Sequence, residues 1–191
     1  MILKKLSSII CLVPIVTFAE VSSSWVIPPP YYQGKHFLEN GGIQFIEENN
    51  DSVLYAFASK NQRDINANTL WMTKCFKSRE KGLSSTSCLI QNQLDKNVKV
   101  LINSNRNIVL LAPTKIKTNE VNYRIDNNQI ISSNNQYFAD TNFQYKLLSN
   151  LLIGNKLSYS YKLNQSYKAG EISLEGFKEN YNFSIAFIRN N

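Results

Sequence analysis

The chain has 191 residues, a formal net charge of +7, three cysteines and one histidine. Its length suits a single domain with a sizeable core. After the first 19 residues, no stretch approaches the roughly 18 apolar residues of a membrane-spanning helix, so we expect no transmembrane segment in the mature chain. A single histidine also argues against a metal site, because zinc takes about four ligands.

The N-terminus has the layout of a cleavable secretory signal. Two lysines at positions 4 and 5 precede an apolar run over residues 9–18, and Ala19 ends a small-residue pattern before the polar Glu20. We therefore predict cleavage after Ala19 and export across a bacterial inner membrane, to the periplasm or to the outside. A short membrane anchor is the alternative, which Pro14 disfavours because it interrupts an already short run.

Removal of this signal leaves 172 residues with a formal charge of +5, because two lysines leave with it. Residues 20–34 are predicted to be a Ser/Pro-rich tether, since the triplet Pro28–Pro30 favours extended polyproline conformation. Trp25, Tyr31 and Tyr32 flank the prolines and either form a binding patch or hold the N-terminus against the domain. Residues 35–191 are expected to form one β-rich domain.

Short strands are expected to follow one another after residues 41–42. Apolar residues recur at every second position, as in half-buried strands, and polar turn residues separate the runs. The expected strands lie around Ile43 and Phe45 and over Val53–Phe57, Leu70–Phe76, Cys88–Leu94, Val98–Ile102, Ile108–Leu111, Val121–Ile125, Gln129–Ile131, Leu157–Leu163 and Glu171–Glu175. The pattern predicts a mainly β fold, an antiparallel β-sandwich-like domain with one or two covering helices.

One helix is predicted between the last strands. Leucines at positions 147, 148, 151 and 152 follow helical spacing after Phe143, Asp140 or Asn142 is available as the N-cap, and Gly154 is placed to end the helix. The C-terminal segment 177–188 is ambiguous, because its apolar residues fit a helix and a strand equally well.

The mature chain keeps two cysteines, Cys75 and Cys88. An even number of cysteines in an oxidising compartment indicates a disulfide. The bond closes a loop of about 14 residues, for which the loop-entropy model gives a stabilisation of roughly 3 kcal/mol.

Three local patterns resemble the invasion-associated locus B family of exported bacterial proteins. They are Trp71–Cys75 with a second cysteine at Cys88, Tyr123–Asp126, and the leucine helix followed by Gly154–Leu157 and Glu171–Phe177. The resemblance spans residues 70–188 and implies a small periplasmic or secreted β-domain linked to host-cell invasion. It carries over only the cysteine pair, as a structural element, and residues 136–139 lack the second cysteine pair that many members have.

The sequence offers little support for catalysis. It has no nucleophile elbow and no glycine-rich phosphate loop, and its one histidine, His36, lies next to the tether. Glu47 with Glu48, and Asp126 with Asp140, are carboxylate pairs, but sequence alone does not place either pair across a cleft. We therefore expect a protein that is not an enzyme and has no cofactor.

The most suggestive polar cluster lies beside the predicted disulfide. Lys74, Lys77, Arg79 and Lys81 fall within eight residues, on a segment that the disulfide would hold still. The cluster is a candidate binding patch, with a solvated charged loop as the alternative. The expected partner is an envelope or host protein or an anionic polymer, and not a nucleic acid, because the chain is exported. A binding protein is therefore predicted, and a periplasmic inhibitor of an envelope-degrading enzyme such as lysozyme is the alternative.

Overall fold

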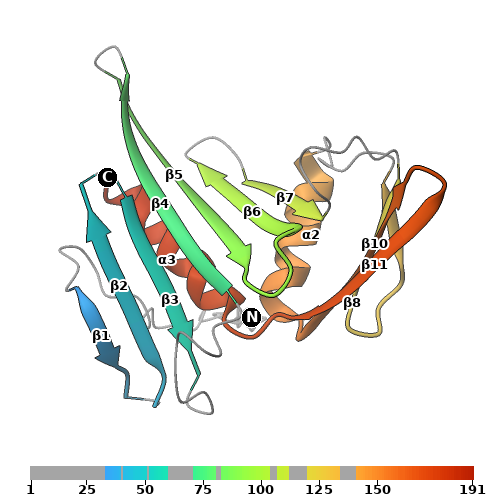
Figure 1. Cartoon of the computed structure of the whole chain (residues 1–191), viewed down its shortest axis with the longest axis horizontal. Coiled ribbons are helices and arrows are strands. Elements are labelled where there is room, and N and C mark those ends of the chain that lie inside the picture. Colours follow the sequence, from blue (N-terminus) through green and yellow to red (C-terminus); the bar gives the residue numbers. More distant parts are fainter. Residues whose placement is uncertain are drawn as a thin grey trace, which may run out of the picture.

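The computed structural model describes residues 33–39, 41–50, 52–59, 71–80, 83–103, 107–111, 120–133 and 141–191. Within these residues the fold is mainly β, with two antiparallel sheets and two helices, as predicted from the alternating apolar pattern. Figure 1 shows the larger sheet with one helix behind it, the second helix at its edge, and the smaller sheet beyond that helix. The predicted signal peptide and nearly all of the tether lie outside the described residues.

The larger sheet, called sheet A here, is a meander of seven strands in which each strand pairs with the next along the chain. The runs of alternating apolar residues follow one another along the sequence, and each strand pairs with the strand before it. The strands are β1 (Gly34–Phe37), β2 (Ile43–Asn49), β3 (Ser52–Ala58), β4 (Trp71–Glu80), β5 (Leu83–Asn92), β6 (Val98–Asn103) and β7 (Asn107–Leu111).

The smaller sheet, sheet B, has the strand order β11-β10-β8-β9. Its strands are β8 (Val121–Ile125), β9 (Ile131–Ser133), β10 (Lys156–Leu163) and β11 (Ser166–Ser173). The predicted hairpin turn after β8 is present, and Asp126 within it accepts hydrogen bonds from the backbone N–H groups of Asn155 and Lys156. This carboxylate therefore ties the turn to the start of β10.

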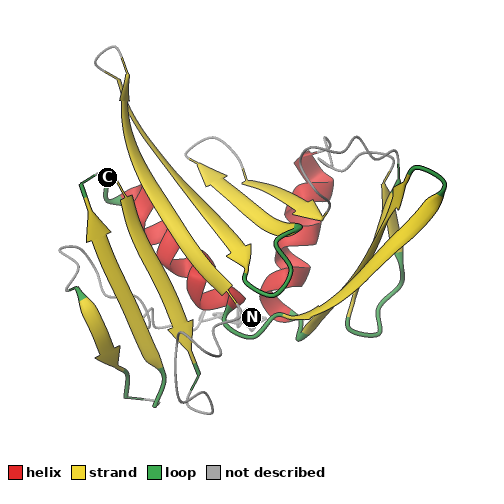
Figure 2. Ribbon diagram, in the orientation of Figure 1, coloured by secondary structure: helices red, strands yellow, loops and turns green. Residues whose placement is uncertain are grey.

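The two helices are α2 (Thr141–Ile153) and α3 (Phe177–Arg189), coloured red in Figure 2. Helix α2 is the predicted leucine helix, and three of its leucines, Leu147, Leu148 and Leu151, are buried. Gly154 follows α2 where the chain passes close to β8, since a Cβ there would lie 2.2 Å from Ile125 Cγ2. A larger residue would therefore displace the Ile125 side chain or the backbone beside it.

Helix α3 resolves the ambiguity of the C-terminal segment. Phe183 and Phe187 pack against residues of β2–β5, while Tyr181 and Ile185 pack on a second core cluster that includes α2 and sheet B. A helix with apolar contacts on two sides has apolar residues at both strand-like and helix-like spacing. For this reason the periodicity alone could not distinguish the two structures.

One core cluster joins the two sheets. It contains inner-facing residues of β4, β5 and β6 together with residues of β8, β10 and the leucines of α2. Trp71 on β4 is central to it, because its ring meets Phe177 edge-on at 5.0 Å and its indole N–H donates to the Ser173 carbonyl oxygen at 3.0 Å. The sheets are therefore parts of one folded unit.

Candidate interaction surfaces

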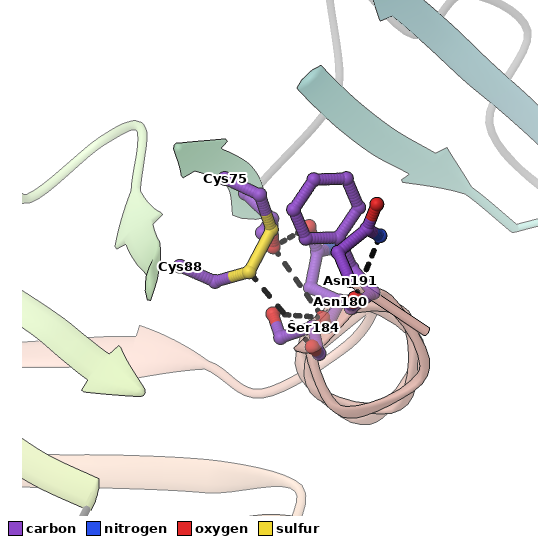
Figure 3. The surroundings of a disulfide bond; sticks show 7 residues. Cys75, Cys88, Asn180, Ser184 and Asn191 are labelled. Atoms are coloured by element: carbon purple, nitrogen blue, oxygen red, sulfur yellow. Dashed lines mark hydrogen bonds between the residues drawn. A yellow bond between two sulfur atoms is a disulfide. The ribbon is translucent and has the colours of Figure 1, made fainter. Parts of the chain in front are cut away.

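The predicted disulfide is present between Cys75 on β4 and Cys88 on β5, which lie directly opposite each other in the sheet. Both cysteines are fully buried. Figure 3 shows the disulfide next to Ser184 and Asn180 of α3. Cys88 Sγ lies 3.8 Å from the Ser184 carbonyl oxygen of α3. This is a packing contact, because a disulfide sulfur carries no hydrogen. The bond is a structural element inside the core, as the prediction had it.

Buried polar side chains hold α3 over the disulfide (Figure 3). Asn180 is fully buried, and its amide donates to the carbonyl oxygens of Trp71 at 3.3 Å and Gly176 at 2.8 Å. The Thr73 hydroxyl donates to Asn180 Oδ1 at 2.8 Å, and Ser184 donates to the Asn180 carbonyl oxygen at 2.8 Å. Sequence reasoning missed these residues, since a polar residue on an apolar helix face weakens the pattern that reveals the face.

The strands that carry the disulfide extend well past their neighbours. β3 pairs with β4 only up to Phe76, and β6 pairs with β5 only from Ser87 onward. Residues 77–80 and 83–86 pair with each other alone. They form a two-stranded extension, called the projecting hairpin here, which rises beyond the rest of sheet A in Figure 1. The disulfide lies two residue pairs before the extension begins.

The predicted basic patch is divided between the two faces of β4. Lys74 is on the face opposite the cysteines, and its Nζ lies 5.2 Å from the centre of the Phe76 ring. Lys77 is on the cysteine face, with its Nζ 5.4 Å from the centre of the Phe187 ring of α3. Arg79 lies on β4 opposite Ser84, and Lys81 lies outside the described residues.

The patch is divided because residues 77–80 belong to strand β4. The prediction had treated this segment as a loop. Successive side chains of a strand point to opposite faces, so cations close in sequence need not share a surface. The structure brings Lys77 and the backbone of Arg79 to the projecting hairpin, and it separates Lys74 from them.

Sheet A has a second surface that the sequence analysis did not identify. We call the side covered by α3 the inner face and the opposite side the outer face, because both helices bury their side chains with inner-face residues. The described apolar residues of the outer face, apart from its alanines, are Phe37, Ile43, Phe45, Leu54, Met72, Phe76, Leu89 and Leu101. Phe37 is 81% exposed and Phe76 is 39% exposed.

A signal for this face was present in the sequence. Six consecutive residues, Val53–Ala58, are apolar in β3, and such a run is typical of a strand with contacts on both faces. Ala56 and Ala58 on the outer face are fully buried beside Ile43, Phe45 and Met72. The prediction used only the alternate residues Val53, Tyr55 and Phe57 as evidence of a buried strand face. It therefore did not identify the outer face as apolar.

Titratable groups of the described residues mostly serve the fold. The Tyr159 hydroxyl donates a hydrogen bond to Asp95 from the turn between β5 and β6, and burial, followed by this carboxylate, raises the pKa of Tyr159. Glu47 and Glu48 are neighbours on β2, where they point to opposite faces and do not form a carboxylate pair. His36 lies opposite Gln44 in the β1–β2 pair. No group of three His, Cys, Asp or Glu side chains gathers among the described residues in a way that would hold a metal ion.

None of the described helices is both long enough and apolar enough to cross a membrane. Comparison with protein-family models, curated proteins and solved structures found no match to this chain.

Proposed function

We propose that the protein is an exported, non-catalytic binding protein of a bacterial envelope, or one released to act on a host, and that it contacts its partner through the projecting hairpin. The observation that carries the proposal is the extension of β4 and β5 beyond β3 and β6, with a buried disulfide close to its base.

A hairpin of this kind has two properties of a recognition element. Its strands are cross-linked and paired, so it loses less conformational entropy on binding than a free loop does. Its outer edges are also unpaired with β3 and β6, so backbone N–H and C=O groups on both sides are available for strand addition.

The charge of the segment favours an anionic partner surface. Lys77 is exposed on β4, and Arg79 and Lys81 follow it in the sequence. Exposed charges act mainly on the encounter rate and weaken with salt. An anionic polymer or an acidic face of an envelope or host protein is therefore the expected partner.

Export is supported by the signal-like N-terminus and by the disulfide, since disulfides persist in oxidising compartments. The resemblance to the invasion-associated locus B family favours the periplasm or secretion and a role at the host cell. Mass spectrometry of the exported protein tests this part, with cleavage between Ala19 and Glu20 as the expected result.

The hairpin is tested by photo-crosslinking in living cells. A photoreactive residue at Ser78 or Ser85, both exposed in the projecting hairpin, should form a discrete covalent product. The same residue at the exposed Lys168 of sheet B is the control position. The triple variant Lys77→Ser, Arg79→Ser and Lys81→Ser should weaken that product, whereas Lys146→Ser, Lys168→Ser and Lys178→Ser should not. Equal products from both triple variants would remove the cations from the proposal.

A second candidate is an inhibitor of an envelope-degrading enzyme such as lysozyme. It is favoured by the same observation, because a narrow, cross-linked hairpin can enter an active-site cleft as a rigid unit. Purified protein should then inhibit hydrolysis of bacterial cell walls by a muramidase in proportion to its concentration. The triple variant of the hairpin should lose that inhibition, and absence of inhibition by the wild-type protein would exclude this candidate for the enzyme tested.

A further inference from the structure

The outer face of sheet A carries apolar and cationic side chains together. Lys74 lies between Leu54 and Leu89 on the neighbouring strands. Lys35 lies opposite Phe45, and Lys99 lies opposite Gln91. Three cations thus border the apolar residues, and two acidic residues share their register, Glu47 on β2 and Glu80 at the end of β4. The surface is therefore both apolar and net positive.

Aromatic residues project from this surface at two places. Phe37 on the edge strand β1 is 81% exposed, and Phe76 on β4 is 39% exposed beside the ammonium group of Lys74. Exposed phenylalanines on a face that also carries buried alanines and partly buried aliphatic residues are more than the scattered apolar residues of an ordinary surface.

The charge distribution decides between the possible occupants. A second copy of the chain on a two-fold axis would bring this net positive face against itself, which like-charge repulsion disfavours. A purely polar anionic polymer would leave the phenylalanines in contact with a polar surface. An anionic lipid surface supplies both partners, because its headgroups attract lysines and its acyl boundary accepts aromatic and aliphatic side chains.

Sheet A can present this face to lipid without exposing unpaired backbone groups of its central strands. Outside the projecting hairpin, the N–H and C=O groups of the paired residues of β2–β6 bond to neighbouring strands, in the plane of the sheet. Only side chains therefore need to enter the headgroup region, and the outer face requires no change of fold for this.

We infer that the outer face of sheet A docks on an anionic membrane surface, with Lys35, Lys74 and Lys99 at the headgroups and Phe37 and Phe76 inserted toward the acyl chains. This surface differs from the projecting hairpin, so the inference goes beyond the proposed function and does not rest on it.

Sedimentation with lipid vesicles tests the inference. The chain should bind vesicles of phosphatidylcholine with one third phosphatidylglycerol more tightly than pure phosphatidylcholine vesicles, and salt should weaken this binding. The triple variant Lys35→Ser, Lys74→Ser and Lys99→Ser should lose roughly 100-fold in partitioning, from about fivefold for each lysine near an anionic surface. The control triple variant Lys146→Ser, Lys168→Ser and Lys178→Ser removes the same charge from α2, β11 and α3 and should lose at most a small part of that.

The variant Phe37→Ser with Phe76→Ser separates insertion from charge attraction. It should weaken binding to the anionic vesicles while the melting temperature stays close to that of the wild type, because both rings are exposed. All variants keep the same N-terminal residues, so any contribution of those residues is common to them.

A residue-resolved measurement identifies the face directly. Spin-labelled lipid in the anionic vesicles should broaden the NMR signals of Phe37, Phe76 and Leu89 and leave those of Lys168 and Tyr167 on sheet B sharp. Absence of binding to anionic vesicles, or broadening centred on any other surface, would overturn the inference. A concentration-dependent dimer that the Phe37→Ser and Phe76→Ser variant abolishes would overturn it as well and would assign the face to a second copy.

Discussion

The two faces of sheet A come from the same strands and have different chemistry. On the inner face, Tyr55 stacks on Phe183 of α3 with ring centres 4.3 Å apart, in the same core cluster as the two cysteines of the disulfide. On the outer face, lysines lie among apolar residues, of which, at the described positions, Phe37 and Phe76 are exposed and only the alanines Ala56 and Ala58 are fully buried. Alternation along one strand thus builds a sealed core on one side and a contact surface on the other.

The comparison shows why the sheet needs its helix. On the inner face, α3 packs on the large rings and supplies an acceptor to the buried Thr73 hydroxyl. On the outer face, the phenylalanines Phe37 and Phe76 lie where water or another surface can reach them. Substitutions on the inner face should therefore change stability, and substitutions on the outer face should change association.

The largest contrast is expected for phenylalanines on opposite faces. Phe183→Ala removes a ring that is 1% exposed and should lower the free energy of unfolding by about 3–5 kcal/mol. Phe37→Ala removes a ring that is 81% exposed and should change it by less than about 0.5 kcal/mol. Denaturant unfolding of both variants measures this. Similar losses would mean that the outer face is covered in the folded protein.

The disulfide gives the next largest effect. Replacement of Cys75 and Cys88 by alanine frees the unfolded chain from a cross-link between residues 13 apart and should cost about 3 kcal/mol. Alanine is chosen because serine would add a buried hydroxyl at each fully buried site. Non-reducing peptide mapping of the wild type should show a single linked pair. Unfolding of the wild type with and without reductant should give the same difference in the free energy of unfolding. A covalent dimer that reductant separates would show that the cysteines pair between chains and not within one.

A smaller loss is expected at the buried amide. Asn180→Leu removes the closer acceptor of the Thr73 hydroxyl, Oδ1 at 2.8 Å, and leaves it only the longer contact of 3.4 Å to the Asn180 carbonyl oxygen. It also removes the side-chain donor to the Trp71 carbonyl, and the two losses together should cost about 2 kcal/mol. Adding Thr73→Val to that variant removes the weakly bonded hydroxyl and should recover part of the loss. A double variant that is less stable than the sum of the single changes would show that packing, and not hydrogen bonding, dominates at this site.

The sequence predicted most strands because turn residues interrupt period-two runs, and it predicted α2 because its leucines form one stripe. It did not predict the length of β4 and β5, since the outer part of that hairpin is polar and is held by pairing between its own strands. β1 was missed because only four residues of it pair, beside a proline-rich segment. Pairing and register are long-range properties that a local pattern does not contain.

The candidate surfaces were predicted less well, for the same reason. Lys74 and Lys77 are three residues apart, and an odd spacing in a strand places them on opposite faces. The prediction treated the residues around Lys77 as a loop and therefore did not separate the two lysines. The cysteine pair was predicted correctly because it depends on the count of cysteines and the compartment and not on register.

The smallest expected effect concerns Glu179, a partly buried carboxylate on α3. Burial is the main cause that raises the pKa of Glu179, on the first turn of α3. Burial is also the main cause that raises the pKa of Tyr55, and the negative charge of Glu179 adds to it. A carboxyl group with a raised folded-state pKa favours the folded state below its unfolded pKa, and this contribution is lost as the pH rises through the folded pKa. The charged form of Glu179 should therefore weaken the fold at neutral pH relative to acid.

Glu179→Gln removes this titration. The variant should match the wild type near pH 4 and exceed its stability at pH 7.5 by about half a kcal/mol, since partial exposure of the group screens the effect. Glu47→Gln, at an exposed position of the outer face, is the matched control for loss of a negative charge. The helix dipole acts in the opposite direction, because a negative charge near the N-terminus of α3 is favourable. Glu179→Gln could instead prove less stable than the wild type at pH 7.5. The helix dipole would then contribute more to the free energy of unfolding than burial does. The first turn of α3 would be more open to water than the packing of Phe183 on Tyr55 indicates.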